Sequence, residues 1–216
     1  MIYPYTPEAS AKCLRIMGFE GTIDQAYSKL SEEDVTFKPA AAEIPFQRIE
    51  IKDVNPNSLD LIVGKVELVE NHPEADKLYI LQVSFGDSQI QLVAGLRKHY
   101  SIEQILGKKI IVVANLKKAR FRGKESQGML LAADDGISTH FLTVSDSIPP
   151  GTKVKIGPYG FNGTKVVTID DLAAYKLMVT EKGEVKATIG NKEEILLAGA
   201  EPVKPESPVI AGARVR

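Results

Sequence analysis

Short runs of branched and aromatic residues, separated by turn residues, fill the chain from residue 59 to residue 133 and constrain its fold more than any other feature. Runs of this length and composition are typical of β-strands, and the turn residues between them favour hairpins. A short helical segment interrupts the series, with Ser101 in position to cap its start and Gly107 to end it. The chain is therefore predicted to be mainly β. The five predicted strands are 59–70, 77–86, 89–96, 108–115 and 128–133.

Three strands, a short helix and two further strands follow one another in the order found in the OB-fold. That fold is a five-stranded barrel that binds nucleic acid with a strand face and with loops, among them the connection between strands four and five. In this chain that connection is residues 116–127. We therefore predict a five-stranded OB-fold barrel with a short N-terminal helical segment and a small C-terminal β-rich extension.

Changes in composition divide the chain into three parts. Thr6 and Pro7 resemble a helix start, and a proline-containing stretch that ends near residue 58 is typical of an extended linker. After the barrel, residues 178–189 read as a β-hairpin, and the tail 200–216 is expected to be extended or mobile. The predicted parts are residues 1–55, the helical segment and linker; residues 56–157, the barrel; and residues 158–216, the C-terminal subdomain and tail.

Positive charge is concentrated in one segment. The formal net charge is −1, yet residues 101–124 carry seven basic side chains against one acidic, whereas residues 125–150 carry four acidic and no basic ones. Such a pattern indicates a local electrostatic site, and Lys and Arg supply most of the affinity for nucleic-acid phosphates. The ring of Phe121 could stack on an unpaired base or pack beneath the loop as an anchor. The basic residues are Lys108, Lys109, Lys117, Lys118, Arg120, Arg122 and Lys124.

Motifs of catalysis and of metal binding are missing from the sequence. It contains neither a glycine-rich phosphate loop nor a His-Glu-x-x-His pattern. The turn around His72 offers one strong metal ligand, and no carboxylate or cysteine pattern accompanies His99 or His140. We therefore predict no cofactor and no metal site, and the chain is not expected to be an enzyme by itself.

Cysteine usage and hydropathy point to the interior of the cell. Cys13 is the lone cysteine, which excludes an intrachain disulfide, and it reads as part of an apolar helix face. No run of 18 apolar residues could span a bilayer, and the first residues, "MIYPYTPEAS", lack the features of a signal peptide. We expect a cytoplasmic protein with no membrane partner.

Three stretches carry a resemblance to a known family: "VGKVELVENHPEADKLYILQV" at residues 63–83, "NLKKARFRGKESQGMLLAA" at 115–133 and "IPPGTKVKI" at 148–156. Over residues 59–155 the chain resembles a shared tRNA-binding domain. That domain occurs in the C-terminal extension or β subunit of methionyl-tRNA synthetase, in endothelial monocyte-activating polypeptide II, and in a yeast cofactor that delivers tRNA to synthetases. The resemblance implies binding of the outside corner of tRNA with little reading of sequence.

The resemblance also implies which residues contact tRNA. Ser126 and Met129 match the family's Ser-x-x-Met, although Met129 can also be a core methionine that starts the last strand. Lys118 and Arg122 join the set because they belong to the basic segment. No catalytic or metal-binding residue is predicted. The predicted tRNA-binding residues are Lys77, Asn115, Lys117, Lys118, Arg120, Arg122, Ser126 and Met129.

Residues 1–50 resemble the end of the anticodon-binding domain of methionyl-tRNA synthetase, but the synthetase signatures His-x-Gly-His and Lys-Met-Ser-Lys-Ser are absent from the sequence. The resemblance implies non-catalytic, largely sequence-independent tRNA binding that assists the methionyl-tRNA synthetase catalytic subunit, either as a β subunit or as an appended domain. The alternative is a protein-assembly module that docks on an aminoacyl-tRNA synthetase complex. Short bacterial forms of this domain are homodimers, which implies a homodimer here. The residues after 157, however, weakly resemble a subdomain that imitates the second subunit, and this favours a monomeric pseudo-dimer.

Overall fold

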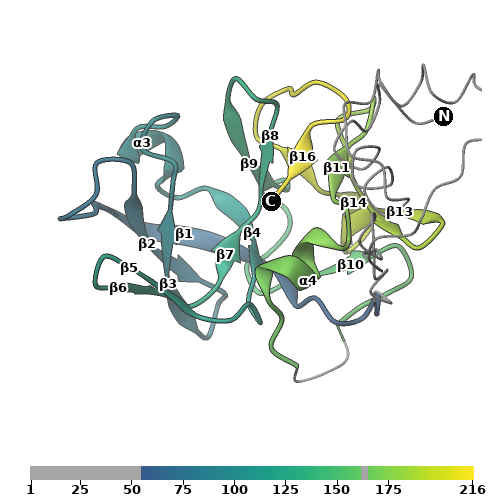
Figure 1. Ribbon diagram of the computed structural model, residues 1–216, viewed down its shortest axis with the longest axis horizontal. Helices are drawn as coiled ribbons and strands as arrows, with labels where there is room; N and C mark the ends of the chain where they lie inside the picture. Colours follow the sequence, from purple (N-terminus) through teal and green to yellow (C-terminus); the bar gives the residue numbers. More distant parts are fainter. Residues whose placement is uncertain (1–54, 162–164) are drawn as a thin grey trace, which may run out of the picture. The chain divides into compact units, whose positions relative to one another are not determined.

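The protein is mainly β with antiparallel strands, as the short branched runs predicted (Figure 1). The computed structural model describes residues 55–161 and 165–216. The helical segment and most of the linker predicted within residues 1–55 lie outside these residues. In the described parts of the chain, no helix is long and apolar enough to cross a bilayer.

The first strands appear in the predicted order. β1 (Leu61–Asn71), β2 (Tyr79–Ser84) and β3 (Gln89–Ala94) form consecutive antiparallel hairpins, and α3 (Ile102–Ile105) leads into β4 (Lys109–Val113). β4 returns to pair with residues 61–65 of β1, whereas β2 pairs with residues 65–71 along the opposite edge of that strand. β1 is therefore held on both edges.

The fifth predicted strand, and the loop predicted before it, are both divided in the structure. The strand becomes β7 (Met129–Leu130), which pairs with β4, and β8 (Ala132–Asp134), which pairs with β9 (Thr139–Thr143). The loop contains a further hairpin of β5 (Ala119–Phe121) and β6 (Lys124–Ser126).

Backbone pairing among the described residues does not close a five-stranded barrel, because β3 pairs there with β2 alone. The physical reason lies in the segment that faces β3. Ser126 and Gln127 contact β3 through two side-chain hydrogen bonds and a single backbone bond, from the N–H of Gln127 to the carbonyl oxygen of Gln91 at 2.9 Å, and these take the place of a strand ladder. The mainly β, antiparallel class is confirmed, whereas the number of strands is higher than predicted.

The C-terminal part is β-rich, as predicted. After β10 (Lys153–Ile156) and α4 (Ile169–Ala173), β11 (Met178–Val179) and β12 (Val185–Ile189) form the hairpin expected at this position. β13 (Lys192–Ala198) pairs with both β12 and β10. The tail is paired along part of its length, because it contains β14 (Glu201–Pro202), β15 (Lys204–Pro205) and β16 (Arg214–Val215), which pair with β13, β9 and β8.

β4 is buried on both faces and separates two apolar clusters. Ile110 and Val112 lie in a cluster formed largely by β1–β3 and α3, whereas Ile111 and Val113 lie in a cluster that extends to Leu196 on β13. Successive side chains of a strand point to opposite faces, so one short strand serves both clusters. The C-terminal part therefore shares its core with the first strands, and Lys52–Arg216 form one compact unit.

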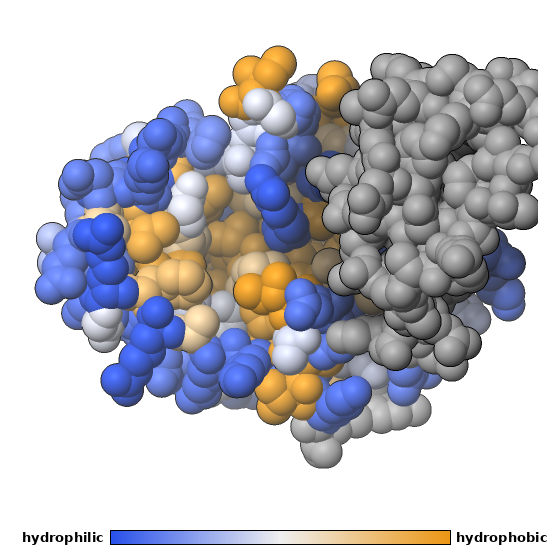
Figure 2. Space-filling view, in the orientation of Figure 1, coloured by the Kyte–Doolittle hydropathy of each residue, from blue (hydrophilic) through white to orange (hydrophobic). Residues whose placement is uncertain are grey.

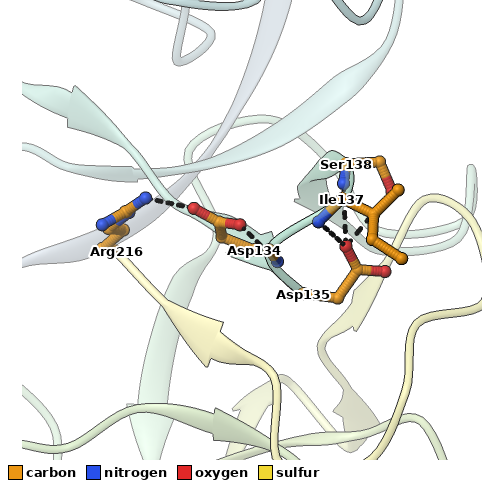
Figure 3. Close-up of polar contacts among 6 residues, drawn as sticks. Asp134, Asp135, Ile137, Ser138 and Arg216 are labelled. Carbon is orange, nitrogen blue, oxygen red and sulfur yellow. Dashed lines mark hydrogen bonds and ion pairs between the residues drawn. The ribbon is translucent and has the colours of Figure 1, made fainter.

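The turn between β8 and β9 is held by the carboxylate of Asp135 (Figure 3). Its Oδ1 accepts the backbone N–H groups of Ser138 at 2.8 Å and Ile137 at 2.9 Å. These two backbone bonds, with that from Ser138 the larger cause, lower the pKa of the Asp135 carboxyl. The neighbouring Asp134 forms an ion pair with Arg216, which joins the end of β16 to β8.

Candidate nucleic-acid interface

The centre of the basic segment is a short two-stranded hairpin, residues 119–126, which we call the basic hairpin. Its ladder has three residue pairs, Ala119–Ser126, Arg120–Glu125 and Phe121–Lys124. The two central residues of its turn both have positive φ, 43° at Arg122 and 84° at Gly123. Positive φ at both positions gives a turn whose twist matches that of the strands. Glycine adopts this backbone readily, whereas arginine rarely does.

The tip of the basic hairpin is held by His72, a residue of the turn between β1 and β2. The ring is buried, and its Nε2 lies 3.0 Å from the carbonyl oxygen of Phe121. Nδ1 accepts the backbone N–H of Glu74 at 3.1 Å, so the ring proton belongs on Nε2, which donates to Phe121. Arg122 Nη1 also donates to the carbonyl oxygen of Glu74, at 2.7 Å.

The base of the basic hairpin is held by side chains that contact β3. Ser126 is buried, and its hydroxyl accepts the backbone N–H of Val93 at 3.0 Å and donates to the carbonyl oxygen of Gly128 at 2.8 Å. Gln91 Nε2 donates to the carbonyl oxygen of Glu125 at 2.7 Å, and the backbone N–H of Gln91 donates to Gln127 Oε1 at 3.0 Å. Contacts at both ends therefore fix the direction in which the hairpin projects.

Several predicted cations are exposed and free to meet a ligand. Lys77, Lys117 and Arg120 are exposed, as is Lys124 on β6. Among the residues that the structure describes, none contacts the side chain of any of these four through a hydrogen bond or an ion pair. Lys118 is also exposed, but its Nζ lies 3.4 Å from Glu125 Oε1. Ion pairs of this exposed kind contribute little stability, so Lys118 can exchange its partner for a phosphate.

Two other predicted residues point into the protein. Asn115 Nδ2 donates to the carbonyl oxygens of Ser58 at 2.7 Å and Lys165 at 2.8 Å, while its Oδ1 accepts the N–H of Asp60 at 2.9 Å. Met129 is half-buried and packs against the larger apolar cluster, as the core alternative for this residue predicts. Both side chains therefore already have protein contacts that shape the ends of β4 and β7.

Phe121 is held through its backbone, whereas its side chain belongs to neither apolar cluster. Its backbone carbonyl is bound by His72, yet the residue as a whole is 42% exposed. The ring is therefore available to stack on a base while the backbone is held. Figure 2 shows hydrophilic residues around the place of β5 and β6, with some apolar residues between them.

A separate polar cavity of about 480 Å³ lies between α3, β9 and the tail. There the Tyr100 hydroxyl lies 3.3 Å from His140 Nδ1, and Ser138 Oγ lies 2.7 Å from His140 Nε2. Burial, followed by the charge of Glu206, raises the pKa of Tyr100 to about 12, so the hydroxyl keeps its proton. None of the predicted tRNA-binding residues lines this cavity.

Sequence reasoning missed His72, Glu74 and Gln91 as parts of this interface. His72 and Phe121 are 49 positions apart, and Gln91 and Glu125 are 34 apart. No local pattern joins residues at such separations. One indirect signal is present in the sequence: a histidine in a turn that also contains proline and carboxylates, a pattern that by itself predicts only a poor metal site.

The antiparallel β fold and its fixed basic hairpin form a module whose exposed positive charge suits contact with nucleic-acid phosphates. Residues 61–153 match the model of the family described as "Putative tRNA binding domain". The module is thus a tRNA-binding domain of the type found with methionyl-tRNA synthetase.

Relatives of known name share this region. The methionine–tRNA ligase of Picrophilus torridus is 32% identical over 208 residues, which are 96% of this chain and 29% of that protein. The methionine–tRNA ligase of Thermotoga maritima is 35% identical over 175 residues, or 71% of this chain and 27% of that protein. The chain therefore spans less than a third of the length of these two ligases.

A solved structure resembles more than the matched domain. The C-terminal domain of Plasmodium vivax p43 has a TM-score of 0.65 and 25% identity, and the match covers 76% of this chain and 99% of that one. This coverage exceeds residues 61–153, so the likeness includes residues outside the tRNA-binding domain itself.

Proposed function

We propose that this chain binds tRNA without catalysis and largely without reading its sequence, and that it assists methionyl-tRNA synthetase as a β subunit or an appended domain. The observation that carries the proposal is the fixed basic hairpin, together with exposed cations around it whose side chains have no partner among the described residues. Lys and Arg at such positions fit phosphates, which give affinity and orientation but carry no sequence information.

The contacts divide the predicted residues into two groups. Lys77, Lys117, Lys118, Arg120 and Arg122 supply charge at the surface, and Lys124 belongs with them. The contacts of Asn115, Ser126 and Met129 within the protein favour an indirect effect on tRNA binding, through the shape of the surface. Loss of one cation should then lower the salt dependence of binding, whereas loss of a shaping residue should leave it unchanged.

Domain organisation follows from the same proposal. Residues 56–157 are the OB-fold tRNA-binding domain. In it, Ser126 and Gln127, at the base of the basic hairpin, contact β3. Residues 158–216 are a subdomain that covers it, and residues 1–55 correspond to the end of a synthetase anticodon-binding domain. The match to the P. torridus ligase over 96% of this chain supports that arrangement. The setting would be the cytoplasm, where tRNA is aminoacylated.

The proposed function is tested by fluorescence anisotropy with labelled tRNA over a series of salt concentrations. We expect binding that weakens steeply with salt and that is lost when Lys117, Lys118 and Arg120 are all replaced by Glu. The matched control is Lys182→Glu, an exposed lysine in the turn between β11 and β12, which should bind like the wild type. Salt-independent binding, or normal binding by the triple variant, would contradict the proposal.

The synthetase partner and the oligomeric state are tested separately. A tether that holds tRNA near a catalytic subunit raises its effective concentration, so addition of the chain should lower the KM for tRNA of a catalytic subunit that lacks this domain. β13 already covers the edge of β10, which favours a monomeric pseudo-dimer over a homodimer. Light scattering should give the mass of one chain. Synthetase capture without any change in KM would support the protein-assembly alternative.

A further inference from the structure

The buried polar side chains of this protein are concentrated on one feature. Tyrosines apart, the buried polar side chains among the described residues are His72 and Ser126, at 3% and 4% exposed. Both form hydrogen bonds that hold the basic hairpin. Burial of a polar group is unfavourable unless its hydrogen bonds are made, and both of these side chains make theirs with backbone atoms.

The basic hairpin needs such support because it is too small to be stable by itself. It has three residue pairs, and a two-stranded hairpin of this size is at best marginally stable in water. Arg122 adds an unfavourable backbone conformation at the tip. The tip keeps one conformation only if contacts from outside the hairpin hold it there.

His72 supplies that contact with both ring nitrogens. Nε2 donates to the carbonyl oxygen of Phe121, whereas Nδ1 accepts from Glu74, whose carbonyl oxygen in turn accepts from Arg122. The ring thus joins the tip of the hairpin to the turn between β1 and β2. That turn also carries the exposed Lys77.

We propose that His72 is a positioning residue for RNA binding: it holds the tip of the basic hairpin so that Arg120, Phe121 and Lys124 meet RNA in a preset arrangement. It touches no RNA itself, because the ring is buried beneath the hairpin. This inference rests on the proposed function. It adds that affinity depends on preorganisation by one buried histidine as well as on charge.

The test compares His72→Leu, which fills the space but forms no hydrogen bond, with His72→Gln, whose amide can donate to Phe121. We expect His72→Leu to bind tRNA about five- to tenfold more weakly, because the hairpin must be ordered on binding. The salt slope should stay that of the wild type, because no phosphate-binding cation is removed. His72→Gln should recover part of the affinity, and the control His99→Gln, at an exposed histidine, should change nothing.

Hydrogen exchange of the free protein separates this inference from the proposed function. In His72→Leu, amides of residues 119–126 should lose protection while those of β4 keep it. Unchanged protection of the hairpin, or equal affinity of His72→Leu and wild type, would overturn the positioning role. Loss of protection throughout the protein would show a general folding defect and would overturn it as well. If the wild type fails to bind tRNA although the hairpin loses protection in the variant, the proposed function is the part that is wrong.

Discussion

At the scale of single residues, some side chains of the basic hairpin supply charge, whereas others hold the hairpin in place. Arg120 is exposed, and the described residues offer its side chain no partner, whereas Arg122 donates to Glu74 from a backbone conformation that arginine rarely adopts. Ser126, close by in sequence, is buried. Neighbouring residues of one short hairpin therefore affect binding in different ways, and substitutions can distinguish them.

Replacement of Arg120 by Gln should remove one phosphate contact. The plot of log affinity against log salt concentration should become shallower by about 0.7–0.9, the change expected for one contact. Arg122→Gln should weaken binding further than its charge explains, because it also releases the tip from Glu74. Anisotropy titrations at four or more salt concentrations measure both effects. Equal slopes for Arg120→Gln and wild type would show that Arg120 does not contact phosphate.

Replacement of Ser126 by Ala should lower stability without changing the salt slope. The variant leaves the N–H of Val93 and the carbonyl of Gly128 without the hydroxyl, which should lower the free energy of unfolding by about 1–3 kcal/mol. Urea denaturation measures the loss, and Ser88→Ala, on the exposed turn between β2 and β3, is the control. A shallower salt slope in Ser126→Ala would instead indicate direct contact with RNA.

At the scale of elements, turns decide how the strands meet. The turn between β8 and β9 depends on one carboxylate, Asp135, which two backbone N–H groups bind. The turn of the basic hairpin depends on residues far away in sequence. One turn of this chain is therefore held by a residue within it, and another by a residue 49 positions away in the sequence.

The stability of the β8–β9 turn should depend on pH. The pKa of Asp135 is lowered in the folded state, so its stabilising effect is present above the ordinary value of 3.8 and is lost as the pH falls through the lowered value. The melting temperature of Asp135→Asn should therefore decline less than that of the wild type between pH 5 and pH 2. Asp87→Asn, in the turn between β2 and β3, is the control, and a decline as shallow as that of Asp135→Asn would argue against the carboxylate of Asp135.

Strand order could be predicted from the sequence, because β1–β4 are rich in branched residues and are separated by turn residues. The basic hairpin could not, because its strands are three residues long and highly charged, so they lack the alternation that marks a strand. The pairing of the tail was missed since prolines argue against strands, although edge positions tolerate them. The exposed cations of the site could be predicted from the charge of the segment alone. The residues that hold the basic hairpin could not, because their role depends on tertiary contacts.

At the scale of the whole molecule, the two apolar clusters on either side of β4 make Lys52–Arg216 a single unit. Leu196 illustrates the connection: it is fully buried on β13, yet it belongs to the same cluster as Ile111 and Val113 of β4. A change in the C-terminal part should therefore be felt by the part that carries the basic hairpin.

Leu196→Ala should lower the free energy of unfolding by about 2–5 kcal/mol, as expected when a fully buried leucine leaves a cavity. Because the core is shared, the β-rich unit should still unfold in one calorimetric transition, shifted as a whole to lower temperature. Ile210→Ala, at an exposed isoleucine of the tail, should leave the transition in place. Two separate transitions of the β-rich unit in Leu196→Ala would show that the C-terminal part folds independently.

Because β4 is buried on both faces, it also determines how long a segment must be to fold and bind RNA when it is fused to another protein. A graft that ended at residue 157 would keep every cation of the basic hairpin, but the apolar cluster that contains Ile111 and Val113 would lose the side chains that β13 contributes to it. Such a fusion would carry an aggregation-prone face next to its binding surface. The shortest segment that can be transferred should therefore start near residue 55 and continue through Val215, although the residues proposed to bind RNA occupy only a small part of it.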